Sequence, residues 1–258
     1  MPNYSHKEND AILDKWNKRS IEKSMGEIES DGVAYKGSIK TFSGDDGQVY
    51  HERMAGNEEK IWNESPRRIL FIAKELNDPN NPYDSRVVVR YDEQNGIYST
   101  DKFIKNMLFI NHGLQKMNGE NYEALDREIS MDELMKVWDE SAVAKINVKK
   151  QPGGSTANMY EISEAIVLFE DLLKAQLSLL DANIIVCCDG SGILIDRIKN
   201  LLYSDAIQIN DYVWYSPHSG VCLINSYHLK PRNKTYEEVY ERVVKSFSDS
   251  LKDMPAIN

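Results

Sequence analysis

Polar residues follow each of four short apolar runs in this sequence, and several of them are titratable. Glu75 comes after the first run, and His228 comes after the fourth. Asn147 lies at the end of the second run, with Lys149 and Lys150 behind it. Titratable groups in such places can act as an acid, a base or a clamp for an anion. The candidate catalytic and binding residues therefore lie where the apolar runs end.

The four runs predict the strands that must position these residues. They are apolar at consecutive positions, which is typical of strands buried on both faces. Helical segments lie between them, so we expect a mainly parallel sheet covered by helices on both faces. Ligands bind at the carboxyl ends of the strands in such sheets, and Glu75, Asn147 and His228 should converge there. The runs cover residues 69–73, 142–148, 183–188 and 221–225.

Helical periodicity is clearest over residues 160–180, where apolar side chains recur every three or four positions. Two capping boxes open further helices, one formed by Ser130 with Glu133 and one by Thr235 with Glu238. We also expect helices over residues 100–117 and 191–202, and a strand or hairpin over residues 206–215.

The first 65 residues differ from the rest of the chain. Asn9 or Asp10 is expected to cap a helix that runs to about Glu29, and a strong turn signal follows at residues 43–47. We predict an N-terminal helical extension with an irregular connection over residues 1–65. An α/β domain should then occupy residues 66–258, with three α/β/α layers and a central, mainly parallel, four-stranded sheet.

The composition limits the classes of function. Lys plus Arg is 31 and Asp plus Glu is 41, so the formal net charge is 31 − 41 = −10. Non-specific nucleic-acid binding usually needs a basic surface, which in an acidic protein must be a local patch. No apolar run is long enough to cross a membrane, and the N-terminus lacks the apolar core of a signal peptide. We therefore expect a soluble, cytoplasmic protein that does not bind membranes.

Several common sites are excluded or left open by the motifs. The three cysteines cannot form a disulfide framework, and no Cys or His pairs have metal-ligand spacing, so we expect no metal and no cofactor. P-loop, dinucleotide-binding and Gly-x-Ser-x-Gly patterns are absent. The Asp-Gly-Ser-Gly segment at residues 189–192 is either a tight strand-to-helix turn or an anion contact at a helix N-terminus.

The order of the strand-end motifs resembles the uracil-DNA glycosylase superfamily over roughly residues 67–250. Residues 68–75 are similar to its first strand and catalytic loop, and residues 144–152 to a second strand that ends in Asn followed by Lys and Pro. Residues 222–228 resemble the strand that leads to the second catalytic motif. The Lys-Glu pair in the first loop resembles a divergent bacterial branch of this family.

The resemblance implies base excision in DNA repair. The protein would flip a damaged or deaminated base out of DNA and hydrolyse its N-glycosidic bond. Glu75 would orient or activate the attacking water, and His228 would stabilise the departing base anion. Asn147 would hydrogen-bond the edge of the flipped pyrimidine, and Tyr83 would stack on the base. The expected partner is DNA, including single-stranded DNA, or another nucleobase-containing ligand, bound by a monomer.

Departures from the family pattern keep other functions open. Leu229 and Lys230 follow His228 where the family usually has Pro and Ser. A catalytically impaired binding protein for a nucleic acid or nucleotide is therefore the alternative. A third possibility is an interaction protein whose N-terminal helix docks a partner through a stripe around Trp16 and Ile21, although this stripe would also suit packing on its own domain. Contacts to the nucleic-acid backbone are expected from Lys149, Gly190, Ser191, Lys230 and Arg232.

Overall fold

A seven-stranded mixed sheet lies at the centre of the computed structural model, in the order β1-β7-β4-β8-β11-β10-β9. The structure describes residues 3–43, 49–76, 84–87, 91–92, 97–98, 101–117, 121–154 and 156–254. The inner strands β7, β4, β8 and β11 are parallel, and the outer strands β1, β10 and β9 run antiparallel to their neighbours. The sheet strands are β1 (Gly32–Val33), β4 (Arg68–Ala73), β7 (Ala142–Asn147), β8 (Ile184–Cys188), β9 (Ile207–Gln208), β10 (Val213–Ser216) and β11 (Val221–Ser226).

The mainly parallel sheet predicted from the four apolar runs is confirmed, because each run forms one of the four inner strands. The predicted number of four strands is wrong, since β1, β9 and β10 extend the sheet to seven. β1 has only two residues, which is too short to show periodicity. β9 and β10 pair as a hairpin where the sequence predicts a strand or hairpin over residues 206–215. Two small hairpins lie outside the sheet: β2 (Ile39–Ser43) with β3 (Val49–Arg53), and β5 (Tyr91–Asp92) with β6 (Ile97–Tyr98).

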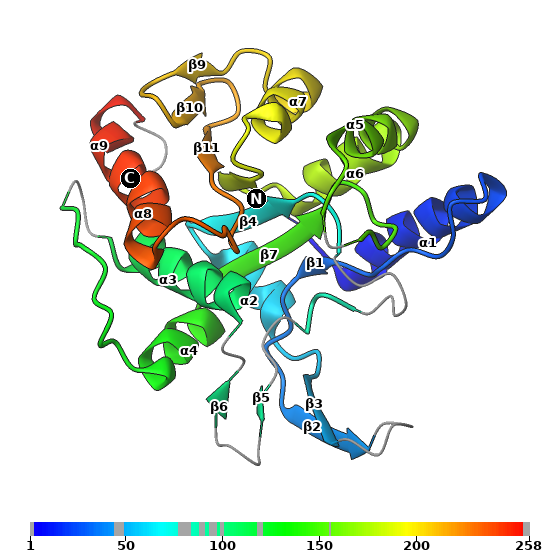
Figure 1. Cartoon of the computed structure of the whole chain (residues 1–258), viewed down its shortest axis with the longest axis horizontal. Helices are drawn as coiled ribbons and strands as arrows, with labels where there is room; N and C mark the ends of the chain where they lie inside the picture. Colours follow the sequence, from blue (N-terminus) through cyan, green and yellow to red (C-terminus); the bar gives the residue numbers. More distant parts are fainter. Residues whose placement is uncertain are drawn as a thin grey trace.

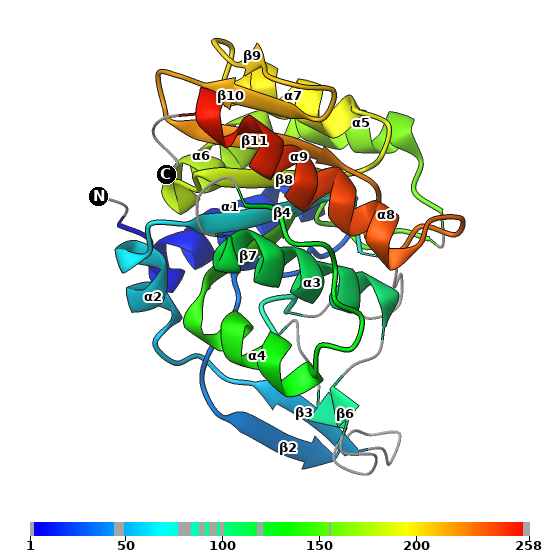
Figure 2. The ribbon, with the colours of Figure 1, turned by 90° about the vertical axis from the view of Figure 1, so that its left-hand side faces the viewer.

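Helices cover both faces of the sheet (Figure 1). Successive side chains of a strand point to opposite faces, so Ile69 and Phe71 of β4 join one hydrophobic cluster while Leu70 and Ile72 join the other. The first cluster includes side chains of α3 (Lys102–Lys116), α4 (Met131–Glu140), α8 (Tyr236–Tyr240), the π-helical turn η1 (Glu241–Lys245) and α9 (Ser246–Ser250). Figure 2 is viewed from the side of the sheet on which these helices lie. The second includes side chains of α1 (His6–Glu22), α2 (Glu58–Glu64), α5 (Met159–Leu168), α6 (Glu170–Leu180) and α7 (Ile193–Leu202).

Capping determines where the helices begin. Thr235 and Glu238 form the predicted capping box at α8, and the Ser130 side chain accepts a hydrogen bond from the Glu133 backbone at α4. The predicted cap of the first helix is wrong, because α1 begins at His6 with Ser5 as its cap. Asn9 was a candidate for that cap, but its amide is buried and donates to the Asp31 carbonyl oxygen at 2.7 Å.

The long helix predicted over residues 160–180 is two helices, α5 and α6, that meet at Phe169. The backbone of Phe169 leaves the helical region, with φ −114° and ψ 20°. Its ring stacks on Trp16 of α1 with 5.1 Å between the ring centroids. Trp16 is fully buried by this contact and its neighbours, so the apolar stripe of α1 packs on its own protein, while Ile21 stays exposed.

The N-terminal segment is joined to the central sheet by a buried polar network around Asp31. The Asp31 carboxylate accepts hydrogen bonds from the Asn147 backbone at 2.9 Å, from Lys150 Nζ at 2.5 Å and from Gln176 Nε2 at 2.8 Å. All four residues have 0% exposed surface. β1 begins directly after Asp31 and pairs with β7, so the N-terminal 65 residues contribute a strand to the central sheet. The predicted domain boundary at residues 65–66 stays a prediction.

Among the helices that the structure describes, none has the length and apolar character needed to cross a membrane. One further short helix, η2 (Leu251–Asp253), ends the described chain after α9.

Removing the Asp31 carboxylate should destabilise the protein strongly. Asp31→Ala leaves the buried Lys150 ammonium without its partner, which costs about 3–5 kcal/mol in the free energy of unfolding. Asp171→Ala is the matched control, because its ion pair with Arg19 is exposed and contributes less than about 1 kcal/mol. Urea denaturation measures both. Similar small losses in the two variants would contradict the structural role of Asp31.

Candidate functional site

The carboxyl ends of the inner strands lie side by side. Ala73 of β4 is paired with Asn147 of β7, and Cys188 of β8 is paired with Ser226 of β11. The chain leaves β4 toward the face that carries α3 and leaves β8 toward the opposite face, which carries α7, so the β4–β8 boundary is the switch point where ligands bind in open α/β sheets. We call the ends of these four strands and the loops that follow them the strand-end rim.

Loops after β4 and β7 run alongside each other across this rim. The backbone of Lys149 donates to the Lys74 carbonyl at 2.9 Å, and that of Gly153 donates to the Leu76 carbonyl at 2.7 Å. These bonds hold Glu75 beside the segment that follows Asn147. The structure therefore brings together the first two elements of the predicted site.

Asn147 presents an unsatisfied amide at the rim. Its residue is 0% exposed, and within the described part of the chain neither Oδ1 nor Nδ2 has a hydrogen-bond partner. Leaving a buried polar group unpaired costs about 1–3 kcal/mol. Its backbone, in contrast, is held by Asp31. The strand end is thus rigid, while the side chain that it carries still has a donor and an acceptor to offer.

Glu75 is held more tightly than the sequence predicts. Its side chain is 5% exposed and forms an ion pair with Lys149, which also lies 3.4 Å from Glu161. A Cβ added at Gly153 would overlap the Glu75 carboxyl group, so glycine is needed there for the carboxylate to fit. Lys149 is 8% exposed, and its ammonium is engaged by these carboxylates, which limits its use as a phosphate contact.

His228 lies at the far end of the rim. Its Nδ1 accepts the Lys230 backbone N–H at 3.2 Å, which places the proton of the neutral ring on Nε2. Burial, followed by the charge of Lys74, lowers the pKa of His228 below 6.5, so the ring is neutral at pH 7. Its loop is fixed because Leu229 is buried and its carbonyl accepts from Asn106 Nδ2 of α3 at 2.6 Å.

Two residues that the sequence analysis missed connect the ends of the rim. The Phe103 ring of α3 lies 5.9 Å from the His228 ring, and Lys145 Nζ lies 5.8 Å from the Phe103 centroid. Lys145 is 8% exposed and has no ion-pair partner among the described residues. Lys145 had a signal in the sequence, because it is the only charged residue of the apolar run 142–148. Phe103 had none, since an aromatic residue in a helix is usually core.

The turn after β8 has a structural explanation. The Asp189 carboxylate accepts from the Gly192 backbone at 3.3 Å and from the Leu194 backbone at 3.1 Å, and Ser191 donates to it. Gly190, with φ +75°, donates its N–H to the Ser226 carbonyl at 3.0 Å. A carboxylate therefore already occupies the N-terminus of α7, and phosphate contacts by Gly190 and Ser191 stay a prediction.

A local basic patch surrounds the His228 loop despite the net charge of −10. Lys102 Nζ donates to the carbonyls of Pro231 at 3.0 Å and Lys234 at 2.7 Å, which folds this loop onto the start of α3. Arg232 is exposed, whereas the exposed Lys230 is paired with Asp101. We call this the basic patch: Lys102, Lys105, Lys230, Arg232 and Lys234.

The predicted base-stacking residue Tyr83 lies outside the described residues. Across the ranges that are described, no three His, Cys, Asp or Glu side chains come together as metal ligands would. The rim therefore offers carboxyl, amide, imidazole and ammonium groups as its chemistry.

Comparison with protein-family models and with curated protein sequences finds no match to this chain. The residues of the strand-end rim are consequently the basis for assigning a function.

The His228 ring should titrate below its ordinary value of about 6.5, because burial and Lys74 disfavour the charged form. Lys74→Ala should move the midpoint upward, since it removes a neighbouring positive charge. Lys252→Ala, at an exposed site near the C-terminus, should not move it. NMR titration of the imidazole resonances measures this, and a wild-type midpoint above 6.5 would show that the environment of the ring is misassigned.

Gly153 and Gly154 should respond differently to an added methyl group. Gly153→Ala displaces the Glu75 carboxylate from its pair with Lys149 and costs about 1–3 kcal/mol. Gly154→Ala changes stability by less than about 0.5 kcal/mol, because nothing lies within 4 Å of its added Cβ. Chemical denaturation compares them, and equal stability would mean that Glu75 does not pack against Gly153.

Proposed function

We propose that this protein binds a flipped nucleobase at the strand-end rim and hydrolyses its N-glycosidic bond, as a divergent uracil-DNA glycosylase-like enzyme. The observation that carries this proposal is the buried Asn147 amide, whose donor and acceptor are both unpaired among the described residues. A nucleobase edge that presents a carbonyl beside an N–H is the complement of such an amide. Burial suits this role, because base readout gains from a site without competing water.

The architecture supports the same proposal. Four parallel strands in the order β7-β4-β8-β11, with helices on both faces, are compatible with a three-layer α/β/α glycosylase-like fold. The residues that the family resemblance implicates follow β4, β7 and β11 at the carboxyl edge. The positions of Glu75, Asn147 and His228 along this edge support the proposal.

In this mechanism each group has a separate task. The Asn147 amide binds the base edge, and the neutral His228 donates its Nε2–H to a carbonyl oxygen of the base. The C1′–N bond breaks, and its electron pair stays on the base, where the His228 hydrogen bond stabilises the negative charge. Glu75, fixed by Lys149, orients the water whose oxygen bonds to C1′ and accepts the proton that this water loses. That proton then passes to the base anion, so the products are the abasic sugar and the neutral base.

The basic patch gives the proposal a place for the nucleic-acid backbone. Lys230 and Arg232 lie just after His228, so a phosphate held there would leave its base near the imidazole. Tyr236 adds an aromatic ring among these cations, 5.6 Å from Lys102 Nζ and 5.8 Å from Lys105 Nζ. Aromatic rings among basic residues are typical of proteins that bind single strands.

A binding protein without catalysis is the second candidate, and the packing of Glu75 favours it. The Glu75 carboxylate is engaged by Lys149 and packed against Gly153, with only 5% of the side chain exposed. A carboxylate in that state has less access to an attacking water. The same groups of the strand-end rim would then recognise a base without releasing it.

A base-release assay separates the two candidates. Oligonucleotides carrying uracil, hypoxanthine or xanthine are incubated with the protein at low salt, and alkaline treatment then cleaves any abasic sites. We expect release by the wild type, and a loss of about 100-fold or more in Asn147→Ala and His228→Ala. His218→Ala is the matched control, because that exposed histidine lies away from the rim.

Absence of release from every substrate by a folded protein would contradict the enzymatic proposal. Salt-sensitive binding under those conditions, weakened by Asn147→Ala, would support the second candidate.

A further inference from the structure

Glu29 is a buried acid that neither the sequence analysis nor the proposed mechanism uses. It is 0% exposed, and both carboxyl oxygens lack a hydrogen-bond partner within the described chain. Its backbone N–H donates to the Lys150 carbonyl at 2.9 Å, which places it beside the carboxyl end of β7. Glu29 therefore lies next to the strand that carries Asn147.

The charges that face Glu29 come from three segments. Lys145 of β7 acts most strongly, followed by Asp31 and by Lys150 after β7, and Asp84 contributes from the segment after β4. The two lysines favour the ionised carboxylate and the two acids oppose it. Burial outweighs all four and raises the pKa of Glu29 to about 8. At neutral pH the group is therefore mainly a neutral carboxylic acid.

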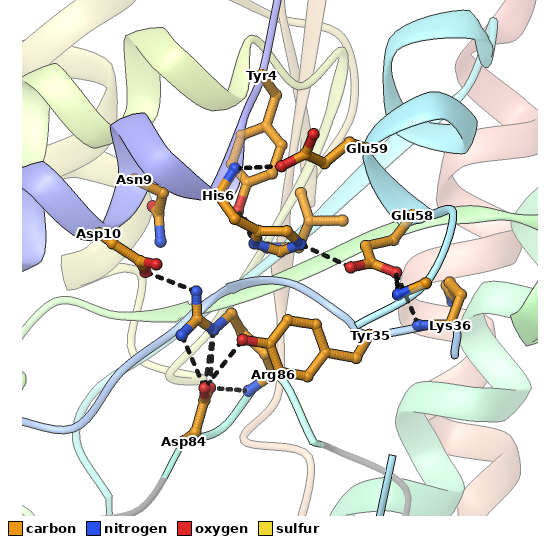
Figure 3. Close-up of polar contacts among 12 residues, drawn as sticks. Tyr4, His6, Asn9, Asp10, Tyr35, Lys36, Glu58, Glu59, Asp84 and Arg86 are labelled. Atoms are coloured by element: carbon orange, nitrogen blue, oxygen red, sulfur yellow. Dashed lines mark hydrogen bonds and ion pairs between the residues drawn. The ribbon is translucent and has the colours of Figure 1, made fainter. Parts of the chain in front are cut away.

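Residues 84–86 lie beside the segment that carries Glu29. The Ser85 backbone donates to the Ser30 carbonyl at 2.7 Å, and the Ser85 hydroxyl is itself buried without a partner in the described chain. Arg86 joins this segment to α1 through an ion pair with Asp10 at 2.7 Å, and it also pairs with Asp84 of its own segment at 2.7 Å, as Figure 3 shows. Glu29, Ser85 and Asn147, each with an unsatisfied polar side chain, thus lie on three segments that meet near the end of β7 through backbone hydrogen bonds.

We propose that Glu29 is a second base-binding residue near Asn147, and that the two select an uncharged lactam-type nucleobase. This inference rests on the proposed function of the rim. A neutral carboxyl group offers an O–H donor and a C=O acceptor side by side, as an amide does. A lactam presents the matching carbonyl and N–H. An ionised Glu29 has only acceptors and would repel the lactam carbonyl.

The proposal sets the direction of the pH dependence. Glu29 is neutral below its pKa of about 8 and loses its donor above it. Base affinity should therefore be constant at lower pH and fall about tenfold per pH unit above the midpoint. Glu29→Gln keeps a donor and an acceptor at every pH. This variant should bind the base with an affinity close to that of the wild type at neutral pH, and without the part of the decline that comes from Glu29.

Calorimetric titration with free uracil and free hypoxanthine tests this at pH values on both sides of 8. Ionisation of the free base affects every variant equally, so the difference between wild type and Glu29→Gln isolates Glu29. Glu29→Ala should lose about tenfold or more in affinity. Glu27→Gln is the matched control, because this exposed acid lies two residues away and should keep the wild-type pH profile. Thermal unfolding confirms that each variant is folded.

Each outcome decides the proposal. A wild-type affinity that falls near pH 8 beside a Glu29→Gln affinity that falls only with ionisation of the free base supports it. If Glu29→Gln loses binding, or declines with pH as the wild type does, Glu29 is not a neutral donor and this inference is overturned, while base binding at the rim stands. If the folded wild type binds neither base, both this inference and the proposed function fail.

Discussion

The carboxylate of Asp31 is the constraint on which the rest of the structure depends. It accepts hydrogen bonds from the last residue of β7, from the buried Lys150 ammonium and from Gln176 of α6. A buried ion pair of this kind adds little net stability compared with an apolar pair, but loss of either partner is costly. Its main effect is therefore specificity, because it fixes one position of the N-terminal segment against the sheet.

Ion pairs near the end of β7 limit which polar groups are available to bind a ligand. Lys150 is neutralised by Asp31, and Lys149 is engaged by Glu75, so neither ammonium is available at the rim. Lys145 and the side chain of Asn147 keep no such partner among the described residues. Native proteins rarely leave buried polar groups unsatisfied without a reason. A ligand that pairs with them would explain their retention at the edge of the sheet where ligands bind.

The parts of this fold that local patterns specify were predictable, and those that depend on distant contacts were not. Apolar runs identified the inner strands, and the Thr235–Glu238 box marked a helix start. The rim followed from the rule that parallel strands end at one edge. Glu29 was expected at the end of a helix, yet it lies beside β7 because Lys150 holds its backbone from a distant part of the chain. No periodicity reports such a pairing.

The proposed function predicts that the Asn147 side chain contacts a nucleobase at the strand-end rim. Two-dimensional NMR of the ¹⁵N-labelled protein tests it directly, with the Asn147 amide signal assigned by its absence from Asn147→Asp. Titration with free uracil or hypoxanthine should shift this side-chain signal in a saturable way, together with the Nε2–H of His228. Shifts confined to other surfaces, or no shift at concentrations that saturate binding, would contradict the claim.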